Sequence, residues 1–155
     1  MQRAIAHFGK GHWPMDAAIA QVTLAFEDRH RRRIRLRPDD GEDFLLDLPK
    51  PVLLADGDGL ELEQGGYIAV RAKVESVAEF TGTDPAHAAR LAWHVGNRHT
   101  ALQVLDDGRL RILYDHVLVD MLEGLGAMVT EIHAPFAPEP GAYSGGGLHG
   151  GHAHD

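Results

Sequence analysis

The sequence contains no cysteine among its 155 residues. This absence excludes disulfides, iron–sulfur clusters, thiolate metal sites and cysteine nucleophiles. Serine is nearly as scarce, since only Ser76 and Ser144 are present, and neither lies in a nucleophile-elbow pattern. The glycine patterns of phosphate-binding and dinucleotide-binding loops are also missing. The sequence therefore favours a protein that is not an enzyme, and any metal it binds must be held by imidazole and carboxylate groups.

Long hydrophobic runs are missing too. No stretch approaches the roughly 18 to 20 apolar residues of a transmembrane helix, and the first ten residues lack the apolar core of a signal peptide. We therefore expect a soluble cytoplasmic protein with no membrane role. The net charge of −8 at pH 7 argues against nucleic-acid binding by the chain as a whole, because contacts to phosphates need clustered cations.

Histidine is abundant and unevenly placed. The chain has 11 histidines, of which 3 lie in residues 1–73 and 8 in residues 74–155. Charge is skewed in the same way: the first part has 11 basic and 12 acidic residues, and the second has 4 and 11. Two halves of different composition predict two small domains, the second rich in groups that hold cations.

The first half shows the period of β-strands. Apolar residues alternate with polar ones over 22–26, 34–36, 44–48, 60–62 and 68–70. Clusters of Gly, Pro and Asp separate these segments and are typical of turns. Residues 1–72 are therefore predicted to form a small all-β domain.

The second half changes to a mixed pattern. A strand over 74–80 is followed by Asp84-Pro85, a helix start, and by apolar residues at helical spacing up to Gly96, which we expect to end the helix in the left-handed conformation. The remaining predicted elements are a hairpin over 102–113, a helix that begins after Asp115, and a strand over 127–132. The order β-α-β-β-α-β predicts a ferredoxin-like domain over 73–134, and hence an α+β protein.

The last part of the chain loses this periodicity. Residues 134–155 contain 6 Gly and 3 Pro, a composition that does not bury enough surface to become ordered. Residues 135–155 are predicted to be a flexible tail. This tail carries His149, His152 and His154, three imidazoles close enough in sequence to surround one Zn²⁺, Cu²⁺, Ni²⁺ or Co²⁺ ion. We interpret the tail as metal-binding.

Two further histidines are candidate ligands. His99 follows the first helix and should be exposed at the edge of its domain, whereas His116 lies in the first turn of the second helix. Spacing alone gives only weak support to either, because a lone histidine is usually an ordinary surface or core residue. His87 and His94 are expected to be solvated on the helix surface.

Two other patterns have simpler explanations. Residues 56–59 resemble the start of a calcium loop, but Leu60 stands where a ligand is needed, so a turn is favoured. Residues 29–37 contain six arginines. Ile34 and Leu36 alternate with them, as in a strand with one face in solvent. A protein-docking role for this strand is favoured over nucleic-acid binding.

Several motifs together resemble the urease accessory nickel metallochaperones of the UreE family. They are Leu91-Ala-Trp-His-Val-Gly-Asn-Arg-His99, Tyr114-Asp-His-Val-Leu-Val-Asp-Met-Leu122, Pro135-Phe-Ala-Pro-Glu139, Gly141-Ala-Tyr143 and the histidine-bearing tail. The resemblance implies an N-terminal domain likened to a peptide-binding module, a ferredoxin-like metal domain, and a homodimer formed through the latter. It further implies that His99 and its symmetry mate share one Ni²⁺ ion.

The sequence departs from the family pattern in two places. Many relatives have His-Asp-His where this chain has Tyr114-Asp115-His116, so an auxiliary site there is reduced to His116. The tail also has only three histidines, which predicts a modest nickel storage capacity.

The resemblance implies a nickel metallochaperone that delivers Ni²⁺ to urease and works with the urease accessory GTPase in a urease pre-activation complex. Zn²⁺, Cu²⁺ or Co²⁺ could replace nickel in vitro. Two alternatives remain open. One is a general zinc, copper or nickel sensor or buffer without a urease client, and the other is an interaction module that uses the arginine-rich strand.

Overall fold

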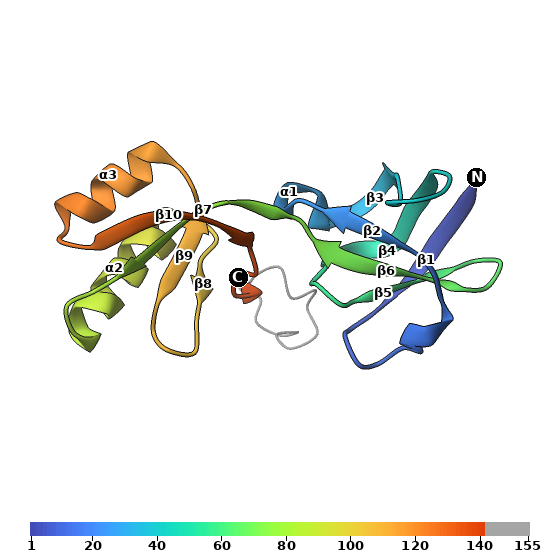
Figure 1. Cartoon of the computed structure of the whole chain (residues 1–155), viewed down its shortest axis with the longest axis horizontal. Helices are drawn as coiled ribbons and strands as arrows, with labels where there is room; N and C mark the ends of the chain where they lie inside the picture. Colours follow the sequence, from blue (N-terminus) through green and yellow to red (C-terminus); the bar gives the residue numbers. More distant parts are fainter. Residues whose placement is uncertain (142–155) are drawn as a thin grey trace. The chain divides into compact units, whose positions relative to one another are not determined.

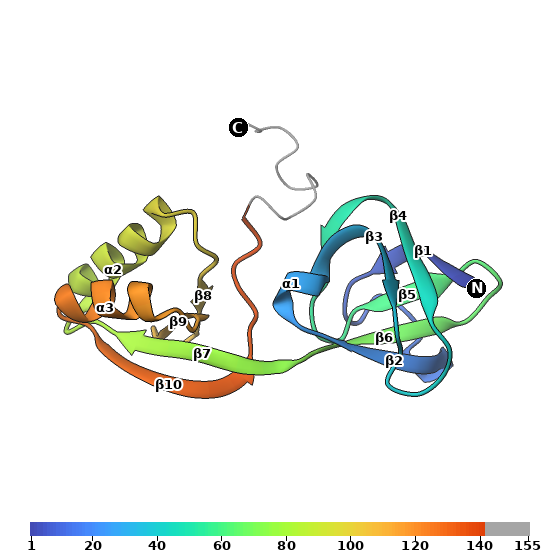
Figure 2. The same cartoon turned by 90° about the horizontal axis from the view of Figure 1, so that it is seen from above.

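The computed structural model describes residues 1–141. The chain forms two compact units (Figures 1 and 2), of which the N-terminal unit contains Met1–Lys73 and the C-terminal unit is Val74–Glu139. The N-terminal unit is rich in strands, and the C-terminal unit combines strands and helices. This architecture confirms the predicted fold class. In the described part of the chain, no helix has the length and apolar character needed to cross a membrane.

The N-terminal unit is a six-stranded sheet with the strand order β2-β6-β5-β1-β4-β3. Its strands are β1 (Gln2–Phe8), β2 (Ala18–Leu24), β3 (His30–Leu36), β4 (Phe44–Leu53), β5 (Gly59–Leu62) and β6 (Tyr67–Ala72). Most pairs are antiparallel, but β1 pairs with β4, and β2 with β6, in parallel. The alternating apolar residues point inward and build one core, in which Leu46, Leu60 and Val70 are fully buried.

Two details differ from the sequence prediction, in β1 and in α1. The strand β1 had not been predicted, because its apolar residues are too few to give a clear alternation. A short 3₁₀ turn, η1 (Met15–Ala17), precedes β2. The helix α1 (Phe26–Arg29) follows β2. Phe26 therefore lies in this helix and not in the strand predicted over 22–26. A single helical turn is too short to show a period in sequence.

The sheet curves, so that its two edges are bridged. The turn after β3 is attached to β2 through Asp39, whose backbone amide donates to the carbonyl of Gln21. The Asp39 carboxylate accepts hydrogen bonds from the Gln21 amide, from the Thr23 backbone and from the Thr23 hydroxyl. These side-chain hydrogen bonds hold the pKa of Asp39 below its ordinary value.

The C-terminal unit has a four-stranded antiparallel sheet with the order β10-β7-β9-β8. Its elements are β7 (Val74–Thr81), α2 (Pro85–Asn97), β8 (Gln103–Val104), β9 (Leu110–Leu113), α3 (His116–Gly124) and β10 (Met128–Pro135). Both helices lie on the same side of the sheet (Figure 2). Their apolar faces pack on it around Phe80, Leu91 and Leu122. This is the ferredoxin-like arrangement that the sequence predicted.

The helices begin as their sequences indicate. Asp84 caps α2 by accepting a hydrogen bond from the backbone amide of His87, with Pro85 in the first turn. Asp115 caps α3 and accepts from the amides of Val117 and Leu118. These carboxylates satisfy amides that have no partner within the helix.

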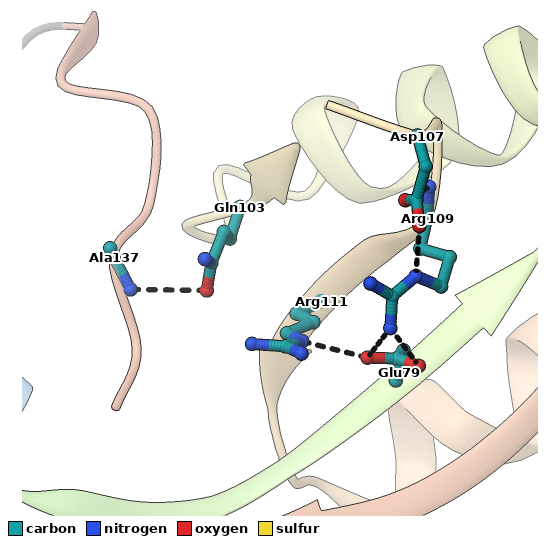
Figure 3. A network of polar contacts seen from close by, with 6 residues as sticks. All are labelled: Glu79, Gln103, Asp107, Arg109, Arg111 and Ala137. Atoms are coloured by element: carbon teal, nitrogen blue, oxygen red, sulfur yellow. Dashed lines mark hydrogen bonds and ion pairs between the residues drawn. The ribbon is translucent and has the colours of Figure 1, made fainter. Parts of the chain in front are cut away.

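The segment after β10 is ordered further than the sequence suggested. Phe136 is fully buried, the amide of Ala137 donates to the side chain of Gln103 (Figure 3), and the amide of Glu139 donates to the carbonyl of Leu102. The prediction that the flexible tail starts at residue 135 is therefore wrong for 135–139. One buried aromatic residue anchors a segment whose proline content had indicated disorder. Residues 142–155 lie outside the described part of the chain.

Candidate metal site

His99 occupies a special backbone position at the end of α2. Two hydrogen bonds end this helix: the amide of His99 donates to the carbonyl of Gly96, and the amide of Thr100 donates to the carbonyl of Val95. This pair of bonds is the Schellman motif, in which the residue after the cap adopts the left-handed conformation and is usually glycine. His99 has a φ of 58°, the only positive φ among the described non-glycine residues.

The preference of glycine for positive φ predicts this conformation at Gly96 instead, and that prediction is wrong. Gly96 lies within α2, which continues to Asn97, so the chain turns three residues later than predicted. This backbone conformation lowers the stability of the fold, because a residue with a Cβ atom is disfavoured in the left-handed region by about 1 kcal/mol. Uncommon backbone conformations of this kind cluster at functional sites.

His99 lies in an exposed surface region. Residues 96–99 are all exposed, and a Cβ atom placed on Gly96 would meet no atom within 4 Å. One turn before Gly96, Trp93 has 61% of its surface exposed and packs edge-on against the ring of His94. The end of α2 thus presents an imidazole, a large aromatic ring and an unobstructed stretch of backbone to the surroundings.

His116 is the first residue of α3, as expected, and the structure shows that it is exposed. It follows the capping residue Asp115, whose Oδ1 accepts hydrogen bonds from two backbone amides. Tyr114, which stands where relatives were expected to have histidine, is 40% exposed. His116 therefore offers one exposed imidazole next to a carboxylate whose Oδ1 already caps the helix.

No single-chain metal site is assembled in the described residues. Among residues 1–141, no group of three or more histidine or carboxylate side chains is close enough to hold a metal ion. His99 and His116 are thus the predicted ligands that the structure describes, and neither forms such a group. The other three predicted ligands, His149, His152 and His154, fall in the segment beyond residue 141.

His87 has a structural role that the sequence analysis missed. Its Nδ1 accepts a hydrogen bond from the amide of Thr83 at 2.9 Å, and its Nε2 donates to the carbonyl of Leu125 at 2.8 Å. The ring therefore joins the start of α2 to the end of α3. Because both ring nitrogens are engaged, His87 is not the solvated residue that was expected, and it has no lone pair available for a metal. Nothing in the local sequence indicated a partner 38 residues away.

A polar network supports the opposite face of the sheet (Figure 3). The Glu79 carboxylate on β7 accepts hydrogen bonds from Arg109 and from Arg111 on β9, and Arg109 also bonds to Asp107. Partial burial raises the pKa of Glu79, but the hydrogen bonds and charges of the two arginines outweigh it and hold the pKa below its usual value. The network uses two of the four arginines of this unit and fixes the β8–β9 hairpin to β7.

Comparison with known protein families gives two matches that together span the chain. Residues 2–73 match the model of the UreE urease accessory protein N-terminal domain, and residues 75–155 match the model of the C-terminal domain. The sequence-based resemblance is thus confirmed by both domains.

Curated relatives agree with these family matches. The chain is 52% identical over 145 residues to the urease accessory protein UreE of Chelativorans sp. (strain BNC1). This alignment covers 90% of the chain and 91% of that protein. It is 48% identical over 147 residues to urease accessory protein UreE 1 of Brucella suis biovar 1, covering 94% and 90%. It is 47% identical over 154 residues to UreE of Rhodopseudomonas palustris (strain HaA2), covering 99% and 70%.

Proposed function

The chain belongs to the UreE family of urease accessory proteins, and from this premise we propose that it is a nickel metallochaperone. It binds Ni²⁺ through histidine side chains and delivers the ion to urease while the urease active site is assembled. In this proposal nickel is cargo, and the protein catalyses no reaction of its own.

The observation that carries the proposal is the placement of His99. An exposed imidazole stands in a conformation that normally needs glycine, at the end of a helix that is capped at both ends. Packing does not explain a histidine there, because the residue is exposed. A requirement for its imidazole explains the histidine at this position, since neutral imidazole is a good ligand for Ni²⁺.

One imidazole does not hold a nickel ion tightly, so the site needs further donors. We propose that the protein is a homodimer formed through the C-terminal unit. A two-fold contact at the end of α2 brings His99 together with its symmetry mate. The exposed Trp93 and the unobstructed backbone at Gly96 support such a contact, because large exposed aromatic residues are enriched at protein interfaces.

Further donors complete the ligand set in this proposal. His149, His152 and His154 supply imidazoles to the shared ion, and His116 provides an auxiliary site on α3. An all-nitrogen and oxygen site binds nickel less tightly than one with thiolates, which suits a carrier that must release its ion. The same donors accept Zn²⁺, Cu²⁺ or Co²⁺, so selectivity in the cell depends on supply and on the receiving protein.

The proposed partners are those of urease maturation. Delivery takes place in the cytoplasm, where the chain meets the urease accessory GTPase in the urease pre-activation complex. The negative charge of the C-terminal half, with 4 basic and 11 acidic residues in 74–155, suits the handling of cations.

A transfer experiment tests the proposal. The chain is loaded with radioactive nickel, mixed with apo-urease bound to its accessory proteins and GTP, and the label in urease is measured together with urease activity. We expect transfer from the wild-type chain and little from His99→Ala, with His133→Ala, another exposed histidine of the same unit, as the matched control. If labelled nickel stays on the wild-type chain under these conditions, the protein is a metal buffer without a urease client.

A further inference from the structure

The segment after β10 passes from one edge of the C-terminal sheet to the other. In the strand order β10-β7-β9-β8, the two edges are β10 and β8. Residues 136–139, which we call the strap, leave β10 and run beside β8 (Figures 2 and 3). The amide of Ala137 donates to Oε1 of Gln103 at 3.1 Å, and the amide of Glu139 donates to the carbonyl of Leu102 at 2.8 Å. The strap therefore brings the chain to the edge of the sheet that directly follows α2.

Alternate residues hold the strap in place. Phe136 has no exposed surface and Pro138 is buried, whereas Ala137 and Glu139 are exposed. The three prolines of residues 134–155 all lie in 135–140, and the six glycines all follow in 141–155. Proline presets φ, which lowers the entropy lost when a segment docks. The strap is thus a preformed base for the residues that come after it.

The point where the strap docks lies close to His99. Leu102, whose carbonyl accepts from the strap, follows His99 by three residues, so their Cα atoms are at most about 11 Å apart. The first of the tail histidines, which are His149, His152 and His154, follows Glu139 by ten residues. Ten residues extend over about 34 Å at most. A tail that starts at the end of the strap therefore reaches His99 with length to spare.

The other edge of the sheet would be a poorer starting point. A tail that left the sheet at Pro135, the last residue of β10, would start three strand positions from β8, about 14 Å across the sheet. Its path to His149 would also be four residues longer. The effective concentration of a tethered group falls as the tether lengthens and as its origin moves away. The strap therefore raises the concentration of tail imidazoles around His99.

From these observations we propose that the strap is a positioning device for nickel, which holds the start of the tail beside His99 so that the tail histidines reach the ion bound there. The proposal rests on the proposed function and adds to it residues that place the tail without touching the ion, namely Gln103, Phe136 and Pro138. Release of the strap weakens the hold of the tail on the ion. The chain can thus loosen its cargo without any change in the ligands themselves.

Paramagnetic relaxation measures the placement of the tail without any metal. The chain has no cysteine, so Ser144→Cys provides a single attachment point for a nitroxide label, five residues beyond Glu139. The probe is the full-length, ¹⁵N-labelled protein. We expect the label to broaden the amide signals of residues 100–104 strongly and those of residues 128–129, at the start of β10, much less.

Variants of the strap change this pattern. Phe136→Ala should reduce the broadening at residues 100–104, because the buried anchor is lost. Gln103→Ala is a milder change that removes the acceptor of the Ala137 amide and should reduce the broadening in part. Gln103→Glu keeps an acceptor oxygen and should restore it, which a general loss of packing would not do.

Nickel affinity tests the functional consequence. It is measured on the full-length chain by competition with a coloured chelator. Phe136→Ala should weaken nickel binding about fivefold, and it should have no effect once all three tail histidines are replaced by alanine. The matched control is His87→Ala, which removes a structural contact away from the strap and should leave the affinity unchanged in both backgrounds.

Three results would overturn the strap proposal alone. The first is equal broadening at residues 100–104 in the wild type and in folded Phe136→Ala. The second is an unchanged nickel affinity in that variant, and the third is a loss of affinity that is the same without the tail histidines, which would mean that the strap only supports the fold. A wild-type chain that binds no nickel would overturn the proposed function as well. If Phe136→Ala does not fold, Gln103→Ala and Gln103→Glu provide the same comparisons.

Discussion

His99 and Gly126 occupy the same position of the same helix-ending motif. After α3, the amide of Gly126 donates to the carbonyl of Glu123, and the amide of Ala127 donates to that of Leu122, as His99 and Thr100 do after α2. Gly126 has a φ of 91° and His99 one of 58°. The two helices of the C-terminal unit thus end in the same motif, but α3 has glycine at the left-handed position, as the backbone prefers, and α2 has histidine there.

This comparison predicts that His99 is kept at the expense of stability. His99→Gly should be more stable than His99→Ala by about 1 kcal/mol, because only glycine adopts positive φ without a steric penalty. Both variants should lose the proposed nickel site. Urea unfolding at pH 7 measures the difference, with Gly126→Ala as the mirror control, which should be destabilised by at least a similar amount. A His99→Gly protein less stable than His99→Ala would contradict this account.

His87 should matter for stability and not for metal binding. His87→Ala removes the hydrogen bonds to Thr83 and Leu125 and should lower the free energy of unfolding by about 1 to 3 kcal/mol. Arg90→Ala, on the exposed face of the same helix, should change it little. Nickel affinity of the folded His87→Ala protein should equal that of the wild type, and a clear loss would show that the ring is a ligand after all.

The lowered pKa of Glu79 predicts a specific acid sensitivity. Because the folded-state pKa lies below the ordinary value of 4.5, the stabilisation from this carboxylate is complete above that value and is lost as the pH falls through the folded-state pKa. Glu79→Gln should cost about 1 kcal/mol at pH 7, and its difference from the wild type should shrink toward pH 3. Urea unfolding across this range measures the effect. The exposed Glu123→Gln is the control, and a difference that stays constant with pH would refute the assignment.

The cap of α3 gives a fourth prediction. Asp115→Ala leaves the amides of Val117 and Leu118 without their acceptor and should cost about 1 kcal/mol of stability. Asp115→Asn keeps an acceptor oxygen and should remain within a few tenths of wild type. Thermal unfolding of the three proteins compares them. Equal losses in Ala and Asn variants would mean that the charge of Asp115, and not its capping bond, is what stabilises the helix.

Much of the fold could be predicted from local chemistry. Asp84-Pro85 and Asp115 began helices where the sequence placed them, because a capping carboxylate acts on amides two or three residues away. The apolar alternation likewise marked the core of the N-terminal sheet. Residues that depend on distant partners were missed. Phe136 is one of them: it is buried and anchors a segment that the sequence composition predicted to be disordered.

The candidate site shows the same division. The sequence placed His99 exposed after the first helix and His116 in the first turn of the second, as the structure has them. The left-handed residue was predicted at Gly96 because glycine normally takes that position. The steric preference for glycine at positive φ fails as a predictor at His99, where the proposed requirement for an imidazole outweighs it. The role of His87 was equally hidden, since its acceptor is a backbone carbonyl at the end of the other helix.

Nickel titration of the full-length chain by calorimetry, combined with native mass spectrometry of the complex, tests the central claim most directly. We expect the wild-type protein to bind Ni²⁺ as a dimer, with affinity that weakens on acidification, because protons compete with the metal ion for the ligand imidazoles. His99→Ala should bind the ion at least roughly tenfold more weakly, while His133→Ala should bind like the wild type. A His99→Ala protein that retains the wild-type affinity and stoichiometry would contradict the account.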